Sequence, residues 1–115
     1  MPNDIERNFF VLIKFAGDVP IRERILESAK PIKEIIERIS NGNYQLVFTA
    51  DSGDSFGYFL RSKEKASLIS AHIQGSTNKT GAAPLLNRDS ILVLEVGDDF
   101  YGYGFSKGWS WLQHR

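Results

Sequence analysis

The sequence has no cysteine, one methionine and two histidines among its 115 residues. Without cysteine there is no disulfide, no thiolate nucleophile and no cysteine-ligated metal, which fits a cytosolic protein. Basic and acidic side chains balance at 14 each, so the chain as a whole has no excess charge that would draw it to nucleic-acid phosphates or anionic lipids. The balance of charge leaves open whether a local basic patch forms.

Long apolar runs are also missing. No run approaches the ~20 residues that a membrane-spanning helix needs. The first residues, MPNDIERN, are charged and lack the apolar core of a signal peptide. We therefore expect a soluble, cytoplasmic protein. The length predicts a single domain over residues 1–115, and an apolar content of 42% is enough to bury a core.

Four runs rich in aromatic and β-branched residues predict strands at 9–15, 44–50, 56–61 and 91–96. The middle two flank a turn at 51–55 and form a hairpin. In the second strand, the period of two predicts one shared face for Tyr44, Leu46, Phe48 and Ala50. In the fourth, ILVLEV, it puts Leu92 and Leu94 on one face and Ile91 and Val93 on the other.

Helices are predicted between these strands. Residues 21–40 are helical in character, but Pro31 predicts a kink or restart and hence two pieces. An apolar stripe marks the second piece, at Ile32, Ile35, Ile36 and Ile39. Asn41-Gly42-Asn43 ends it. A further helix is expected from Lys63 to about Gln74, capped by Ser62 and ended by Gly75. A short terminal helix starts near Ser106.

The element order is that of the split βαβ motif, βαββαβ, with an extra C-terminal helix. We therefore predict an α+β, ferredoxin-like fold with an antiparallel sheet of order 4-1-3-2 and helices on one face. Phe10, Leu12 and Val93 are expected on the other face. Because apolar residues rarely stay bare, we expect the aromatic tail after the fourth strand to cover that face, or a second copy to do so.

A family resemblance follows from three segments: FFVLIKF, FGYFLRSKEKASLI and RDSILVLEVGDDFYGYGFS. Together they resemble small ferredoxin-like proteins of the SinR-like kind, which are similar to the small CRISPR adaptation subunit and its toxin-like cousins. The resemblance implies association through the sheet. In the nuclease-like branch a metal-binding aspartate lies near the end of the first strand. Here Lys14-Phe15 occupies that place and Asp18 follows a turn, which argues against an inherited nuclease activity.

Adjacent carboxylates at Asp98-Asp99 are the candidate metal ligands of a nuclease, with Asp51 or Asp54 as further ligands. The predicted topology places the 51–55 turn and the end of the fourth strand at opposite ends of the sheet, so these aspartates do not converge. We expect a polar turn at Asp98-Asp99 instead, with no metal and no cofactor.

Catalytic patterns are otherwise weak. His72 and His114 have no partner at metal-ligand spacing and belong to no Ser-His-acid order. The Gly102-Tyr103-Gly104 triplet has aromatic surroundings rather than those of a phosphate loop. The sequence favours a non-enzymatic protein over an enzyme.

Single-stranded nucleic-acid binding is an alternative. SFGYFL and FFVL are similar to the signatures of RNA-recognition motifs, whose aromatic side chains stack on bases. Two positions depart from the first signature. Asp54, an acidic residue, lies where a basic residue is expected, and Arg61 lies where the final aromatic residue is expected. The residues that this hypothesis assigns to nucleic acid are Phe10, Phe56, Tyr58 and Arg61.

The hypothesis that the sequence favours is a small protein-interaction module, homodimeric or half of a two-component pair of the antitoxin or immunity kind. Aromatic side chains supply contact area, and carboxylates suit a basic partner surface. The residues assigned to protein contact are Asp98, Asp99, Tyr101 and Tyr103 in the tail, with Asn78 and Lys79 in the long 75–88 connection.

Overall fold

A computed structural model of the protein describes residues 5–17, 19–75, 84–86 and 88–114, with the backbone but not the side chains of Ser106, Trp109 and His114. Along the chain the elements are β1 (Arg7–Lys14), α1 (Ile21–Arg24), the π-helix η2 (Ile25–Ala29), α2 (Lys30–Ile39), β2 (Tyr44–Thr49), β3 (Ser55–Ser62), α3 (Ala66–Gln74), β4 (Ser90–Val96) and α4 (Ser106–His114). None of the described helices is long and apolar enough to cross a membrane.

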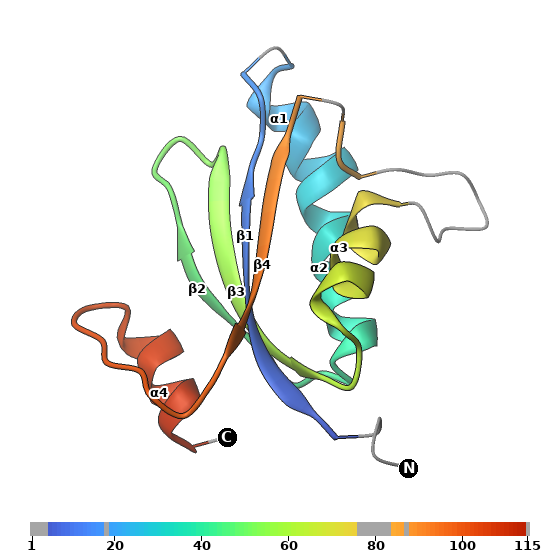
Figure 1. Ribbon diagram of the computed structural model, residues 1–115. Helices are drawn as coiled ribbons and strands as arrows, with labels where there is room; N and C mark the ends of the chain where they lie inside the picture. The colour runs from blue at the N-terminus through green and yellow to red at the C-terminus, as the bar shows by residue number, and fades with distance from the viewer. Residues whose placement is uncertain (1–4, 18, 76–83, 87, 115) are drawn as a thin grey trace.

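The four strands form one antiparallel sheet of order β2-β3-β1-β4. This is the predicted order read from the opposite edge, and with the βαββαβ succession it confirms the ferredoxin-like architecture. Helices α1 to α3 lie on one face of the sheet, and α4 lies on the other (Figure 1). We call these the core face and the outer face.

The core lies between the sheet and the helices α2 and α3. Alternate residues of β1 point into it, as the period of two requires, so Phe9, Val11 and Ile13 are almost fully buried. The predicted isoleucine stripe of α2 packs against them, with Ile32, Ile35 and Ile36 buried. Leu60, Ile69 and Ile73 complete the centre of the cluster.

The two faces of β4 are the reverse of the predicted assignment. Val93 lies directly opposite Val11 and packs against the core. Leu92 pairs with Leu12, and Leu94 pairs with Phe10, on the outer face. The expectation that Val93 lies on the outer face is therefore wrong, because cross-strand neighbours share a face and β1 has Val11 turned inward.

A β-bulge in β2 also changes a prediction. The pairing with β3 shifts between Leu46 and Phe48, so Phe48 lies opposite Gly57 rather than on the side of Tyr44 and Leu46. The extra residue turns Phe48 to the outer face. There its ring fills the space above Gly57, where a Cβ atom would come within 2.7 Å of Phe48 Cε1.

The helices broadly follow their expected limits. The predicted break at Pro31 is a π-helical turn, η2, through which the chain continues from α1 into α2. The backbone N–H of Lys30 bonds to the carbonyl of Ile25 there. Helix α3 begins later than predicted, after Lys65, because the Ser62 hydroxyl accepts a bond from the Glu64 N–H instead of capping the helix.

Candidate functional site

Helix α4 covers one half of the outer face, over β2 and β3. Trp111 stacks on Phe59 with ring centroids 6.0 Å apart and planes within 10° of parallel. Gly108 lies so close to Phe59 and Val47 that a Cβ atom there would come within 3.1 Å of both side chains. The expectation that the tail covers the outer face is thus met for this half of the sheet.

The other half of the outer face, formed by β1 and β4, stays exposed. Leu92 and Leu94 are each 49% exposed. Phe10, Leu12 and Val96 on the same face are half-buried. We call these five residues the leucine face. None of these five side chains is charged. On the outer side of these two strands, the first charged side chain is that of Lys14, at one end of the pairing.

Figure 1 shows β4, in orange, at the edge of the sheet, with β1 beside it. All of β4's hydrogen-bonded pairing in the described chain is with β1, from Ser90 opposite Lys14 to Val96 opposite Asn8. The leucine face therefore ends at an edge strand whose outer backbone groups are not used by another strand.

The tail from Gly97 to Phe105 leaves the end of β4 and turns into α4. Tyr101 and Tyr103 are 92% and 96% exposed, the highest values among its apolar side chains. Phe105, which has a φ of 44°, packs edge-on against Phe48 at 6.0 Å. A pocket of about 210 Å³ opens between the tail and the sheet, lined by Val96, Phe100, Tyr101 and Leu112 among others. It continues the leucine face.

The predicted contact residues Asp98 and Asp99 are exposed in this tail, next to the tyrosines. Asp54 lies at the other end of the sheet, beside Ser55, which pairs with Lys14. The prediction that these aspartates do not converge is confirmed. No group of three or more potential metal ligands forms within the described parts of the chain. Asn78 and Lys79 lie outside the described residues.

The four residues that the nucleic-acid hypothesis names lie in different surroundings. Phe56 and Tyr58 are 5% and 7% exposed and point into the core, so their assignment to base stacking is wrong. Burial also raises the pKa of Tyr58. Phe10 does lie on the outer face, but it packs against Phe59, which Trp111 covers. Arg61 donates hydrogen bonds to Asn8 and Glu6.

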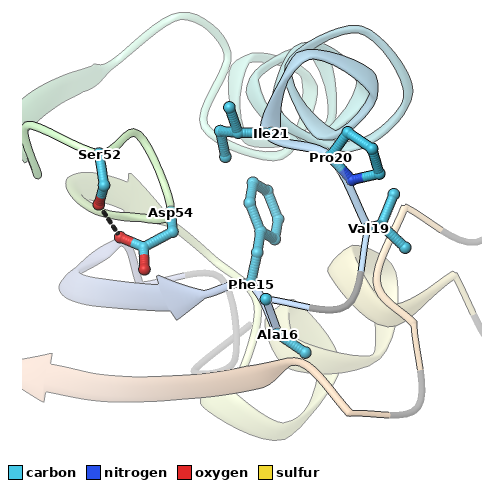
Figure 2. Close-up of a pocket in the computed structure, with 8 residues that line it drawn as sticks. Phe15, Ala16, Val19, Pro20, Ile21, Ser52 and Asp54 are labelled. Atoms are coloured by element: carbon cyan, nitrogen blue, oxygen red, sulfur yellow. Dashed lines mark hydrogen bonds between the residues drawn. The ribbon is translucent and has the colours of Figure 1, made fainter.

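A second cleft, of about 480 Å³, lies at the opposite end of the sheet. Figure 2 shows Phe15 in its centre, with Ser52 and Asp54 on one side and Val19 and Pro20 on the other. Hydrogen bonds from Ser52 and then from Lys14 lower the pKa of Asp54, whose carboxylate is 3.3 Å from the Lys14 ammonium. The Asp54 carboxylate in this cleft is thus already paired, with the Lys14 ammonium and with the Ser52 hydroxyl.

Next to this cleft lies an ion pair that the sequence did not predict. The side chains of Arg24 and Asp89 are 2% and 0% exposed, and the guanidinium binds both carboxylate oxygens. The carboxylate also accepts the backbone N–H groups of Ala16 and Leu86, each at 2.8 Å. The Arg24 guanidinium lies 4.2 Å from the centre of the Phe15 ring. Sixty-five positions separate the two residues, and no local pattern joins them.

Burial alone would raise the pKa of Asp89. The hydrogen bonds from Arg24, together with those from the backbone of Leu86 and Ala16, outweigh the effect of burial and hold the pKa of Asp89 below its ordinary value. The carboxylate therefore stays charged at neutral pH and fastens three segments: the end of β1, α1 and the approach to β4. We assign this pair to stability rather than to chemistry, because both side chains are buried and each has its partners.

No protein-family model matches the chain, and no curated protein matches it. Among solved structures, the chain is similar to a dimeric ferredoxin-like protein from an uncultured marine organism, with 13% identity, a TM-score of 0.43, and coverage of 83% of this chain and 98% of that one. It is also similar to a protein of unknown function from Nitrosomonas europaea, with 17% identity, a TM-score of 0.42, and coverage of 88% and 99%. Neither similarity indicates what this chain binds or does, so its function has to be inferred from its own described surface.

Proposed function

We propose that this protein is a non-enzymatic interaction module that associates with a second copy of itself through the leucine face. The observation that carries the proposal is the exposure of Leu92 and Leu94 beside Leu12 on an uncharged sheet face. Helix α4 leaves this half of the sheet open while it covers the other half. A contiguous apolar surface at a sheet edge is typical of a protein interface.

The physical gain can be estimated from the two leucines. Full burial of a leucine stabilises by about 1.5–3 kcal/mol relative to full exposure, so a half-exposed leucine has about half of this left to gain. In a symmetric pair each leucine counts twice, which makes Leu94 worth about 1.5–3 kcal/mol of association. This corresponds to a change of about 10- to 150-fold in the dissociation constant.

The test is sedimentation equilibrium over a wide range of protein concentration. We expect the natural chain to dimerise and Leu94→Ser to weaken the dimer by about tenfold or more. Leu26→Ser is the matched control, because Leu26 is 66% exposed on η2, on the core-face side of the molecule. A strictly monomeric chain, or equal weakening by both substitutions, would contradict the proposal.

The exposed tail is the region best suited to bind a different protein. Tyr101 and Tyr103 supply apolar area, and Asp98 and Asp99 beside them supply negative charge, which fits a basic partner surface. A two-component role of the antitoxin or immunity kind, and a relation to the SinR-like proteins, stay predictions. If a partner protein binds here, Tyr103→Ala should abolish its binding while the self-association through Leu94 persists, as two titrations on the same variant would show.

A further inference from the structure

We infer that the pocket between the tail and the sheet is a binding site for a small, uncharged aromatic compound of one or two fused rings. The tail and α4 stand out from the outer face at one end of the sheet (Figure 1). Strands β2, β3 and β4 supply Val47, Phe59 and Val96 to the pocket, α4 supplies Leu112, and the tail supplies the rest. The site lies within one copy, so this inference does not depend on the proposed self-association.

The lining of the pocket favours an uncharged occupant. None of the nine described residues that line it carries a charge. A charged group that entered would leave water without a counter-charge, which costs a large amount of free energy. An apolar compound would instead gain from the removal of its surface from water. The chemistry of the walls therefore excludes an ammonium, carboxylate or phosphate group from the interior of the site.

The aromatic side chains of the lining favour a flat ring. Phe59, Phe100, Tyr101 and Phe105 all border the pocket. Aromatic rings attract one another in offset-stacked and edge-to-face arrangements, beyond the gain from burial of their area. Phe59 is the firmly held part of the lining, because Trp111 stacks on its ring and Phe10 packs against it at 5.4 Å. A strand residue held from both sides positions a ligand well.

The volume of the pocket sets the size of the compound. The pocket measures about 210 Å³. An apolar cavity of about 150 Å³ holds benzene. The larger volume here admits a substituted single ring or two fused rings, but not the larger ligands that fill pockets of about 300–1,000 Å³.

Phe105 gives an independent sign that this wall serves a ligand. Its φ of 44° lies in the left-handed region, which is rare for a bulky side chain and costs energy. The residue is 60% exposed, so burial of the ring offsets little of that cost. Strained residues of this kind cluster at ligand-binding sites. We therefore assign the Phe105 ring to contact with the bound compound rather than to the core.

Calorimetric titration with 2-naphthol tests the site, because this probe has two fused rings and is uncharged at neutral pH. We expect saturable binding to one site per chain, with a dissociation constant of about 1 mM or lower. Naphthalene-2-sulfonate has the same rings and a negative charge, and should bind at least about tenfold more weakly. Leu94→Ser should bind 2-naphthol as the natural chain does, because Leu94 does not line the pocket.

The variant Phe105→Asn removes the ring and keeps a residue that tolerates the left-handed conformation. We expect its affinity for 2-naphthol to fall about fivefold or more while its melting temperature does not fall. Tyr103→Ala is the matched control in the same tail, because Tyr103 is 96% exposed and does not line the pocket. Its affinity should stay within about twofold of the natural value.

Several results would overturn the assignment. They are no saturable binding of 2-naphthol, equal binding of the sulfonate, equal losses in Phe105→Asn and Tyr103→Ala, or a loss in Phe105→Asn that comes with a lower melting temperature. Binding to Leu94→Ser but not to the natural chain would mean that the second copy fills the pocket. That result would overturn the small-molecule site and leave the self-association standing. A monomeric natural chain that binds 2-naphthol would do the reverse.

Discussion

The buried ion pair between Arg24 and Asp89 offers the sharpest test of how this fold is held together. The change to make is Asp89→Asn, which keeps the shape of the side chain and removes its charge. One amide oxygen remains to accept a hydrogen bond, but the carboxylate now receives bonds from Arg24, Ala16 and Leu86 together. The N–H groups of the amide would then point at the N–H donors of Arg24, Ala16 or Leu86, which a carboxylate accepts and an amide nitrogen cannot.

The expected magnitude follows from the burial of both partners. Arg24 is 2% exposed and cannot turn to solvent, and its remaining acceptors are the Ser28 hydroxyl at 3.2 Å and the Pro84 carbonyl at 3.5 Å. Removing one partner of a buried pair costs about 3–5 kcal/mol of unfolding free energy. Since the amide of the Asp89→Asn variant keeps part of the bonding, we expect about 3 kcal/mol, which lowers the melting temperature by roughly 12–24 °C.

Urea unfolding followed by circular dichroism measures this difference, and its pH dependence adds a check. The pKa of Asp89 is lowered in the folded protein. Its charge therefore stabilises the fold fully above the unfolded value of about 3.9, and this contribution is lost as the pH falls through the folded value. The gap between the natural chain and Asp89→Asn should be constant from neutral pH down to about 5 and narrow below about 4.

The control is Asp99→Asn, at an exposed position of the tail, where a change within about 0.5 kcal/mol is expected. A loss below about 1 kcal/mol for Asp89→Asn would refute the reasoning, because it would mean that the Arg24 charge is solvated or paired otherwise. A gap that widened in acid would refute the sign of the pKa shift.

Two further predictions concern the outer face. Gly57→Ala should destabilise the fold by about 1–3 kcal/mol, because its methyl group would meet two phenylalanine rings within 3 Å; Gly17→Ala, where nothing lies within 4 Å, should be near neutral, and equal effects in thermal unfolding would contradict this packing. Trp111→Ala should cost about 2 kcal/mol in urea unfolding by removing the ring that stacks on Phe59. A change below about 0.5 kcal/mol would show that α4 does not hold this face.

The sequence predicted the elements and their order well, because those depend on local pattern. The isoleucines of α2 repeat at helical spacing whatever surrounds them, and Gly75 ends α3 with a φ of 88°, which a glycine adopts without strain. The element order then leaves few ways to arrange the sheet, and the predicted one was found.

The candidate site was predicted in part. The exposed tail tyrosines were named from the sequence, and the apolar outer face was expected. Leu92 and Leu94 were not assigned to that face, because alternation divides β4 into two faces without saying which one is inward. The bulge in β2 has no marker such as glycine, since the shift occurs between Leu46 and Phe48.

By itself, then, the sequence determined where strands and helices form, which residues end them, and that the sheet has apolar residues on both faces. The tertiary structure decided which face of β4 is buried, because the pairing of Val93 with Val11 sets it. It also decided that α4 covers β2 and β3 but not β4, which leaves Leu92 and Leu94 exposed. Finally, it joined Arg24 to Asp89. Contacts between residues far apart in the chain depend on packing, and no local pattern records them.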